Sequence, residues 1–123
     1  MRGSSKMIAA CISNESSQYA LTPGVSYLVL GISFIANGET CRVLYQVLND
    51  FGGISHAPAG LFELVDNKCS ASWVARYDAD GSLLLWPKEF FADYFHDDLS
   101  EGDSAVVDAF RGVVVRLREE AGI

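Results

Sequence analysis

The sequence predicts an α+β protein, in which a small antiparallel β-barrel of roughly five or six strands precedes two C-terminal helices. Short runs of alternating apolar and polar residues, separated by turn-forming residues, fill the chain from Met7 to Trp86. Helical spacing of apolar residues begins only after Pro87. The chain has 123 residues and is half hydrophobic, which is enough to bury one core. Residues 7–123 are therefore expected to form a single globular domain.

The first six residues are left out of the fold prediction. Residues 1–4 resemble the start of an expression-vector leader. Residues 8–11 resemble a lipoprotein cleavage box, but only four residues separate Lys6 from Cys11, and a signal peptide has an apolar stretch of about 7–15. The three cysteines lie far apart with no paired spacing, which predicts free thiols in a reducing compartment. We expect a cytoplasmic protein, and no membrane contact, because no apolar run approaches the roughly 18 residues of a membrane span.

The first strands are marked by two turn signals. After an opening apolar run at residues 7–12, Thr22-Pro23-Gly24 places Pro and Gly at the central positions of a type II turn. The strand Val25–Phe34 follows and is apolar on both faces. One face comprises Leu28, Leu30, Ile32 and Phe34, and the other comprises Val25, Tyr27 and Val29. Asn37-Gly38 then predicts a hairpin whose two central residues have positive φ.

The rest of the sheet and the helices follow from the same signals. Segment 49–60 is rich in Gly and is expected to be a loop, and residues 78–81 predict a tight turn. Pro87 suits the first position of a short helix that ends near Phe95. Ser100 with Asp103 resembles a capping box that starts a second helix, which ends near residue 120. The further strands expected are Cys41–Val47, Leu61–Val65, Ser72–Tyr77 and Ser82–Trp86.

The charge of the chain is concentrated in its second half. The formal net charge is −7, and residues 61–123 carry the whole acidic excess. Six acidic side chains lie within residues 89–103, which we call the acidic segment. A negative field of this kind repels phosphate backbones and attracts basic surfaces. We therefore expect a basic protein partner and no nucleic acid.

Catalytic and metal-binding motifs are weak or absent. His56 and His96 have no metal-ligand spacing, and no nucleophile elbow or phosphate-binding loop occurs. An EF-hand-like loop can be counted from Asp78 to Glu89, but Leu83 occupies the position at which the sharp turn needs Gly. A tight β-turn is the favoured interpretation, and calcium binding stays open as an alternative. We predict no enzyme activity, no cofactor and no metal.

Several segments resemble a group of small bacterial proteins with SH3-like barrels. The likeness covers about residues 20–118 and includes Leu21–Gly24, Tyr27–Ile32 and Leu61–Val65, followed by a Trp-containing strand, an Asp-Gly turn and an acidic helix. Proteins of this group are mostly uncharacterised, and some act as immunity partners of toxins. The resemblance implies an SH3-like barrel with C-terminal helices, and it transfers no catalytic residues.

The acidic segment carries the leading hypothesis on function. Glu89, Asp93 and Asp97 are spaced i, i+4, i+8, and like charges at this spacing destabilise a helix by a few tenths of a kcal/mol per pair. Such a stripe beside aromatic residues is typical of an interface with a basic protein. The expected partner-binding residues are Glu89, Asp93, Asp97, Asp98, Phe91 and Phe95. On this hypothesis the protein is an immunity or inhibitor protein that occludes a basic partner such as a toxin.

Two alternatives remain open at this point. The acidic residues can simply form a solvated face that keeps the protein in solution. In the second alternative, an SH3-like structural or adaptor domain binds a peptide or another subunit through the loop 49–60. That interaction would depend on Tyr45, His56 and neighbouring loop residues rather than on the acidic segment.

Overall fold

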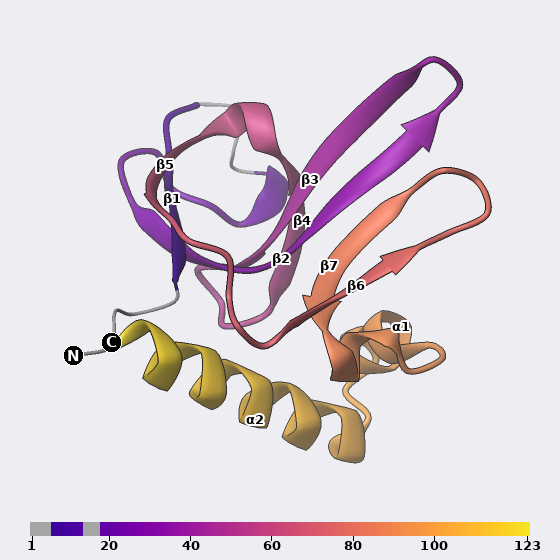
Figure 1. Cartoon of the computed structure of the whole chain (residues 1–123). Helices are drawn as coiled ribbons and strands as arrows, with labels where there is room; N and C mark the ends of the chain where they lie inside the picture. Colours follow the sequence, from indigo (N-terminus) through magenta and orange to yellow (C-terminus); the bar gives the residue numbers. More distant parts are fainter. Residues whose placement is uncertain (1–5, 14–17) are drawn as a thin grey trace.

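The computed structural model describes residues 6–13 and 18–123 and shows an α+β protein with one antiparallel sheet and two C-terminal α-helices (Figure 1). The sheet has seven strands, more than the sequence predicts. They are β1 (Met7–Cys11), β2 (Ser26–Asn37), β3 (Thr40–Leu48), β4 (Ile54–Pro58), β5 (Phe62–Asn67), β6 (Trp73–Tyr77) and β7 (Leu83–Pro87). The helical elements are the 3-10 helices η2 (Ala59–Leu61) and η3 (Lys88–Phe91) and the α-helices α1 (Phe95–Ser100) and α2 (Ser104–Ala121).

The additional strand is β4, which lies inside the segment predicted as a loop. It pairs with β3 from Ile54, opposite Leu48, to Pro58, opposite Leu44. Gly, His and Pro are typical of loops, so they hide the strand character of this segment in the sequence, and Pro is tolerated here because β4 lies at an edge. The prediction of a continuous loop over residues 49–60 is therefore wrong, and the connecting loop is restricted to residues 49–53.

The long strand β2 organises the sheet. Its first part pairs with β1 through Ser26–Leu28, its later part pairs with β7 through Ile32–Phe34, and β3 lies along its other edge. The strand order is β4-β3-β2-β1-β5, with β7 and then β6 attached beside β2. No pairing joins β4 to β5 in the described part of the chain, so the sheet is curved but open. The predicted closed barrel does not form, because β2 continues past β1 into a hairpin that pairs with β7 instead (Figure 1).

Both predicted turns before β3 occur, one of them shifted by a residue. In the first, the Val25 N–H donates to the Thr22 carbonyl over 3.1 Å and Gly24 has φ +86°, as a type II turn requires. In the hairpin, Asn37 pairs with Thr40, so the two central residues are Gly38 and Glu39. Gly38 has φ +65°, whereas Asn37 and Glu39 keep negative φ. This corresponds to a turn with Gly at its first central position rather than to the predicted type with positive φ at both.

A bulge in β2 changes which face its side chains occupy. The pairing register with β3 shifts between Val29 and Gly31. Before the bulge, Tyr27 and Val29 lie in one core cluster and Leu28 in the other; after it, Ile32 joins the cluster of Tyr27. The predicted face that joined Leu28 to Ile32 is therefore wrong beyond Leu30, because one extra residue inverts the alternation. Gly31 is needed here, because a Cβ atom would lie 3.1 Å from the Leu85 carbonyl oxygen.

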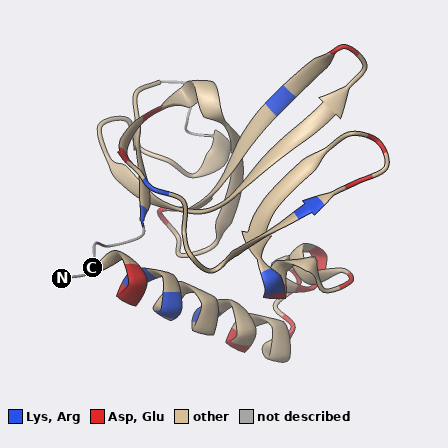
Figure 2. Cartoon of the chain, viewed as in Figure 1, with Lys and Arg blue, Asp and Glu red and all other residues tan. Residues whose placement is uncertain are grey.

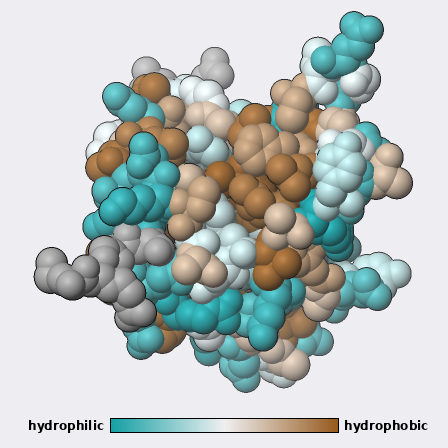
Figure 3. All heavy atoms as spheres, viewed as in Figure 1, coloured by the Kyte–Doolittle hydropathy of each residue, from teal (hydrophilic) through white to brown (hydrophobic). Residues whose placement is uncertain are grey.

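The sheet consequently has two core clusters. The first fills the inside of the curve and contains Met7, Ala9, Cys11, Leu21, Tyr27, Val29, Ile32, Val47, Ala57 and Phe62. The second lies between the sheet and the helices and contains Leu28, Leu30, Phe90, Phe95, Phe110, Val113, Leu117 and Ala121. In the view of Figure 3, apolar residues gather where the hairpins leave the body of the sheet, and hydrophilic residues lie along the helical side. Burial of both faces of β2 is confirmed.

The C-terminal helices start later than predicted. The single helix expected from Pro87 to Phe95 is wrong: the 3-10 helix η3 ends at Phe91, and α1 starts at Phe95. Tyr94 has φ +61°, a left-handed conformation that a continuous α-helix excludes. The second helix begins after Asp103, not Ser100, because the Asp103 side chain accepts a hydrogen bond from the Val106 N–H. Its predicted end near residue 120 is confirmed.

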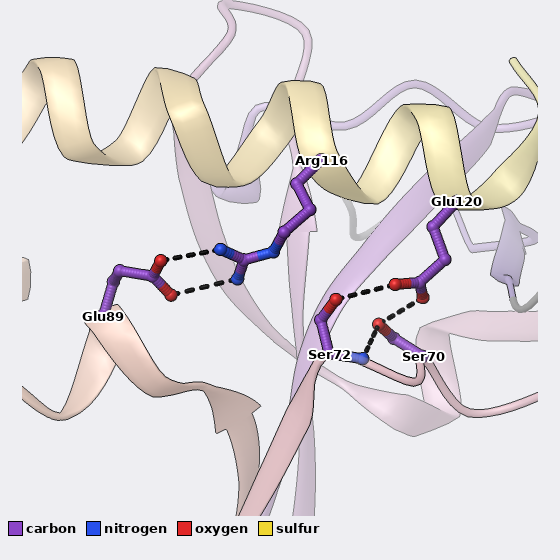
Figure 4. A network of polar contacts seen from close by, with 5 residues as sticks. All are labelled: Ser70, Ser72, Glu89, Arg116 and Glu120. Carbon is purple, nitrogen blue, oxygen red and sulfur yellow. Dashed lines mark hydrogen bonds and ion pairs between the residues drawn. The ribbon is translucent and has the colours of Figure 1, made fainter.

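Two polar contacts fasten the C-terminal half of α2 to the sheet side (Figure 4). Arg116 donates from both terminal nitrogens to the Glu89 carboxylate over 2.7 and 3.0 Å. The Glu120 carboxylate accepts hydrogen bonds from the Ser70 and Ser72 hydroxyls. Paired N–H donors and a carboxylate form one of the strongest side-chain contacts, so we expect these groups to fix how α2 lies on the sheet.

Candidate functional site

An open hollow of about 660 Å³ lies where the β3–β4 loop meets the two α-helices. Residues 51–54 and His56 form one side of it. His96, Asp97, Leu99 and Ser100 of α1, with Val107, Phe110 and Arg111 of α2, form the other. The hollow therefore joins the two regions that the sequence offered as separate candidate sites, segment 49–60 and the acidic segment. Apolar and polar groups line this hollow in similar proportion, and a concave site that combines the two can hold a binding partner.

The loop on one side of the hollow is held in place by hydrogen bonds. The Asn49 side-chain oxygen accepts from the Phe51 and Gly53 N–H groups over 2.9 and 3.0 Å, and its nitrogen donates to the Ser55 hydroxyl. The neighbouring Asp50 carboxylate accepts from the Tyr27 and Thr22 hydroxyls. Within this braced loop the Phe51 side chain is 87% exposed. An exposed aromatic ring on a fixed loop is a feature of protein-binding surfaces.

Two histidines line the hollow without carrying charge at neutral pH. The His56 and His96 ring centroids are 5.0 Å apart, and His96 Nε2 donates to Gln46 Oε1 over 2.7 Å. The edges of Trp86, Phe90 and Phe95 also pack against the His96 ring. Burial, assisted by the neighbouring His56, lowers the pKa of His96 to about 4, against an opposing effect of Asp97. Burial also lowers the pKa of His56, so both rings are neutral at pH 7.

The four predicted acidic site residues do not lie on one helix edge. Glu89 belongs to η3, where the Arg116 guanidinium binds it and lowers its pKa. Asp93 is exposed between η3 and α1, and Asp97 is exposed in the first turn of α1 at the hollow. Asp98, also in α1, is half-buried. Glu89 therefore stabilises the fold, and of the four only Asp97 lines the hollow.

The predicted aromatic anchors are placed differently from each other. Phe95 is 4% exposed and belongs to the core cluster under the helices, so it has no surface to offer. Phe91 is half-buried, stacks on Trp86 with centroids 4.9 Å apart, and has the Arg76 guanidinium over its ring. Tyr94, which is not among the predicted anchors, is 75% exposed. Its exposure follows from the break between η3 and α1, which helical periodicity could not reveal.

Glu89 is the one residue of the acidic segment that forms an ion pair among the described residues. The ion pairs between the residues that the structure describes are Lys6–Asp66, Arg76–Asp78 and Arg116–Glu89. None of them includes Asp93, Asp97, Asp98 or Glu101, so no ion pair of the described residues offsets the charge of these carboxylates. Figure 2 shows acidic residues at α1 and in the loops next to it. Arg111 is the one basic side chain at the hollow.

The expectation that Tyr45 contributes to a binding site can be compared with where its side chain lies. Tyr45 packs against Phe62 of the first core cluster, with ring centroids 5.6 Å apart, and does not line the hollow. Its neighbour Gln46, on the opposite face of β3, is the residue that holds His96. Successive side chains of a strand point to opposite faces, which explains why Gln46 and not Tyr45 contacts His96. No sequence signal marked Gln46, whereas Phe51 was marked only by being an aromatic residue amid turn formers.

The EF-hand-like loop does not gather its ligands. Asp78 pairs with Arg76, Asp80 accepts from the Ser82 N–H, and Glu89 is bound by Arg116 in η3. Across residues 6–13 and 18–123, no group of three or more His, Cys, Asp or Glu side chains could hold a metal ion. The segment between β6 and β7 is an ordinary turn, with Gly81 at φ +93°.

Comparison with protein families, curated proteins and solved structures finds no match for this chain. In the described part of the chain, no helix is both long and apolar enough to cross a membrane.

Proposed function

We propose that the protein binds a basic protein partner at the hollow and blocks it. The observation that carries this proposal is Phe51, whose ring is 87% exposed on a braced loop at the edge of the hollow. A high-affinity protein interface combines an apolar anchor, which becomes buried when the partner binds, with charged residues around it. The exposed Phe51 and the acidic Asp97 at the same hollow support this proposal.

The unpaired carboxylates are assigned the role of attracting the partner. Asp93, Asp97 and Asp98 lie at or beside the hollow, and no ion pair among the described residues takes up their charge. Such a field speeds the encounter with a basic surface, and salt weakens it. Once the partner arrives, its apolar side chains are expected to cover Phe51 and enter the hollow past the uncharged histidines. Neutral rings cost less to desolvate than charged ones, which favours apolar contact there.

An inhibitor and an adaptor would use this same surface, so they differ in what happens to the partner. The acidic excess favours an inhibitor or immunity protein of the kind that blocks a basic toxin, and three free cysteines suit a cytoplasmic location. The SH3-like adaptor is the second candidate. The curved part of the sheet around β1 and β5, together with the braced loop 49–53, supports it.

The test is capture of the partner followed by kinetics with charge variants. The protein is immobilised, proteins retained from its native lysate at low salt are identified by mass spectrometry, and association rates are measured with the purified partner. The double variant Asp93→Lys/Asp97→Lys should slow association by about tenfold or more. Glu39→Lys/Glu63→Lys is the matched control, since it changes the net charge equally at two exposed positions away from the hollow.

Each outcome separates the candidates. Equal slowing by both double variants, or no slowing by either, would remove the acidic segment from the mechanism. If only Asp93→Lys/Asp97→Lys slows association, the partner's own activity is then measured with the protein in excess. Loss of that activity identifies an inhibitor, and unchanged activity identifies an adaptor.

A further inference from the structure

The strand β6 has a free edge that is open to solvent. It pairs with β7 on one side, and no other strand of the described chain pairs with it. Four of its five residues are exposed, including Val74 at 46% and Tyr77 at 75%. The strand is covered only in part: the Trp73 indole N–H donates to the Leu30 carbonyl, and the Arg76 guanidinium lies over the Phe91 ring. Free backbone N–H and C=O groups along such an edge can pair with another strand, although the Trp73 N–H already donates to the Ser70 carbonyl over 3.3 Å.

The other outer strands carry features that discourage pairing, and β6 carries fewer of them. β5 presents Glu63 and Asp66, and its register with β1 is broken by an irregularity. β4 ends in Pro58 and passes directly into η2, and the projecting end of β3 carries the exposed Arg42. Natural edges are protected by such charges, prolines and bulges. β6 has an unbroken register with β7 and contains no Pro or Lys.

The one charge of β6 is neutralised within the same molecule. Arg76 Nε lies 3.0 Å from an Asp78 carboxylate oxygen, and the guanidinium carbon lies 4.7 Å from the centre of the Phe91 ring. Two copies that meet along this edge therefore do not bring uncompensated like charges together. This matters because each copy carries a net charge of −7, concentrated in residues 61–123.

We propose that a second copy of this chain binds the free edge of β6, with the two β6 strands antiparallel about a two-fold axis at Ala75. This register places Ala75 opposite itself, Val74 opposite Arg76, and Trp73 opposite Tyr77. The smallest side chain lies on the axis, and the two aromatic residues pair across the strands, which stabilises an antiparallel ladder. A two-fold interface of this kind is self-complementary and closes at two copies.

The dimer is weak and responds to salt in the opposite direction from the proposed partner binding. A five-residue strand pair buries less surface than a standard protein–protein interface, so association is expected at high protein concentration. Salt screens the repulsion between two acidic copies and strengthens the dimer. The same salt weakens attraction of a basic partner to the acidic segment. The inference is independent of the proposed function, because β6 contributes only Arg76 near α1 and no residue to the hollow.

The test is sedimentation equilibrium over a wide concentration range at low and high salt, with two exposed valines exchanged in turn. Val74→Lys places a lysine opposite Arg76 twice in the interface and should raise the dissociation constant roughly tenfold. Val65→Lys is the matched control on the outer strand β5, where Val65 is 60% exposed, and it should leave the dissociation constant unchanged. A chain that stays monomeric at every concentration, or a dimer that both variants weaken equally, would overturn the proposal.

The register is tested by cross-linking. In a Cys41→Ser/Cys69→Ser background, which removes the exposed thiols, Ala75→Cys should form an intermolecular disulfide under mild oxidation, because residues on the axis face each other. Ala79→Cys, in the exposed turn after β6, is the control and should not cross-link. A dimer in which Cys at position 79 cross-links and Cys at position 75 does not would show another interface and refute pairing about Ala75.

Discussion

The two halves of α2 meet different surroundings, although they belong to one continuous helix. In the C-terminal half, Leu117 and Ala121 are buried, and Arg116 and Glu120 are both bound by groups outside the helix. In the N-terminal half, Val107 and Arg111 border the open hollow. The same contrast divides the acidic segment, since Glu89 is held by Arg116 whereas Asp97 faces the hollow without an ion pair among the described residues.

This difference shows why acidic character alone does not identify a binding residue. In the sequence, Glu89 and Asp97 are both acidic and belong to the same i, i+4, i+8 series. The carboxylate that meets a guanidinium in a half-buried position serves stability, whereas the one that meets solvent beside the hollow is free to attract a partner. Four experiments test whether the side of the helices that is bound through Arg116 and Glu120 differs in this way from the side that borders the hollow.

The largest effect on stability is expected for one of two adjacent aromatic residues, the buried Phe95 and the exposed Tyr94. Phe95→Ala empties a site in the core cluster under the helices and should lower the free energy of unfolding by about 3–5 kcal/mol. Tyr94→Ala removes a ring that is 75% exposed and should change it by less than about 0.5 kcal/mol. Urea unfolding followed by circular dichroism measures both. Similar losses in the two variants would mean that Tyr94 also packs against the core.

The second effect is a dependence of stability on pH that comes from His96, which lines the hollow. The pKa of His96 is about 4 in the folded protein and about 6.5 in an unfolded chain, so the unfolded state binds more protons between these values. Stability from this group is complete above pH 6.5 and declines as the pH falls toward 4. His96→Phe keeps an aromatic ring and removes the titration. Its loss of the Gln46 contact does not vary with pH, so a curve parallel to the wild type would contradict the assignment.

A smaller effect is expected from the two carboxylates. Glu89→Gln weakens the paired contact with Arg116 and should cost about 1 kcal/mol, since the pair is partly exposed. Because the pKa of Glu89 is lowered, this contribution is present above the ordinary value of 4.5 and is lost as the pH falls through the folded value. Asp97→Asn should cost less than about 0.5 kcal/mol in the same unfolding measurement. The reverse order would assign the structural role to Asp97.

The smallest effect on stability is expected at Phe51. Phe51→Ala should change the free energy of unfolding by less than about 0.5 kcal/mol, because the ring is almost fully exposed. Asn49→Ala is the control on the same loop and removes three hydrogen bonds, so it should cost about 1–2 kcal/mol. If Phe51→Ala is as costly as Asn49→Ala in thermal or urea unfolding, the ring supports the loop and is not reserved for a partner.

Local sequence signals determined most of the elements of this protein. Pro and Gly after Thr22, Asn37-Gly38, and the turn at residues 78–81 each mark a real reversal of the chain. The alternation of β2 and the apolar spacing of α2 predicted both elements, because each depends on residues only a few positions apart. The acidic segment and the absence of catalytic spacing were equally visible in the sequence.

How those elements pack together depends on contacts that the local signals do not contain. One extra residue in β2 inverted the faces of its later half, and the left-handed conformation at Tyr94 ended the expected helix and exposed its ring. Pairing with β3 turned half of a glycine-rich segment into β4, which brought His56 against His96 and placed Phe51 at the same hollow as Asp97. The contact of His56 with His96 joins residues about 40 positions apart, and local periodicity carries no information at that separation. The chain composition therefore indicated an acidic protein, whereas burial and pairing selected which of its aromatic and acidic side chains are exposed.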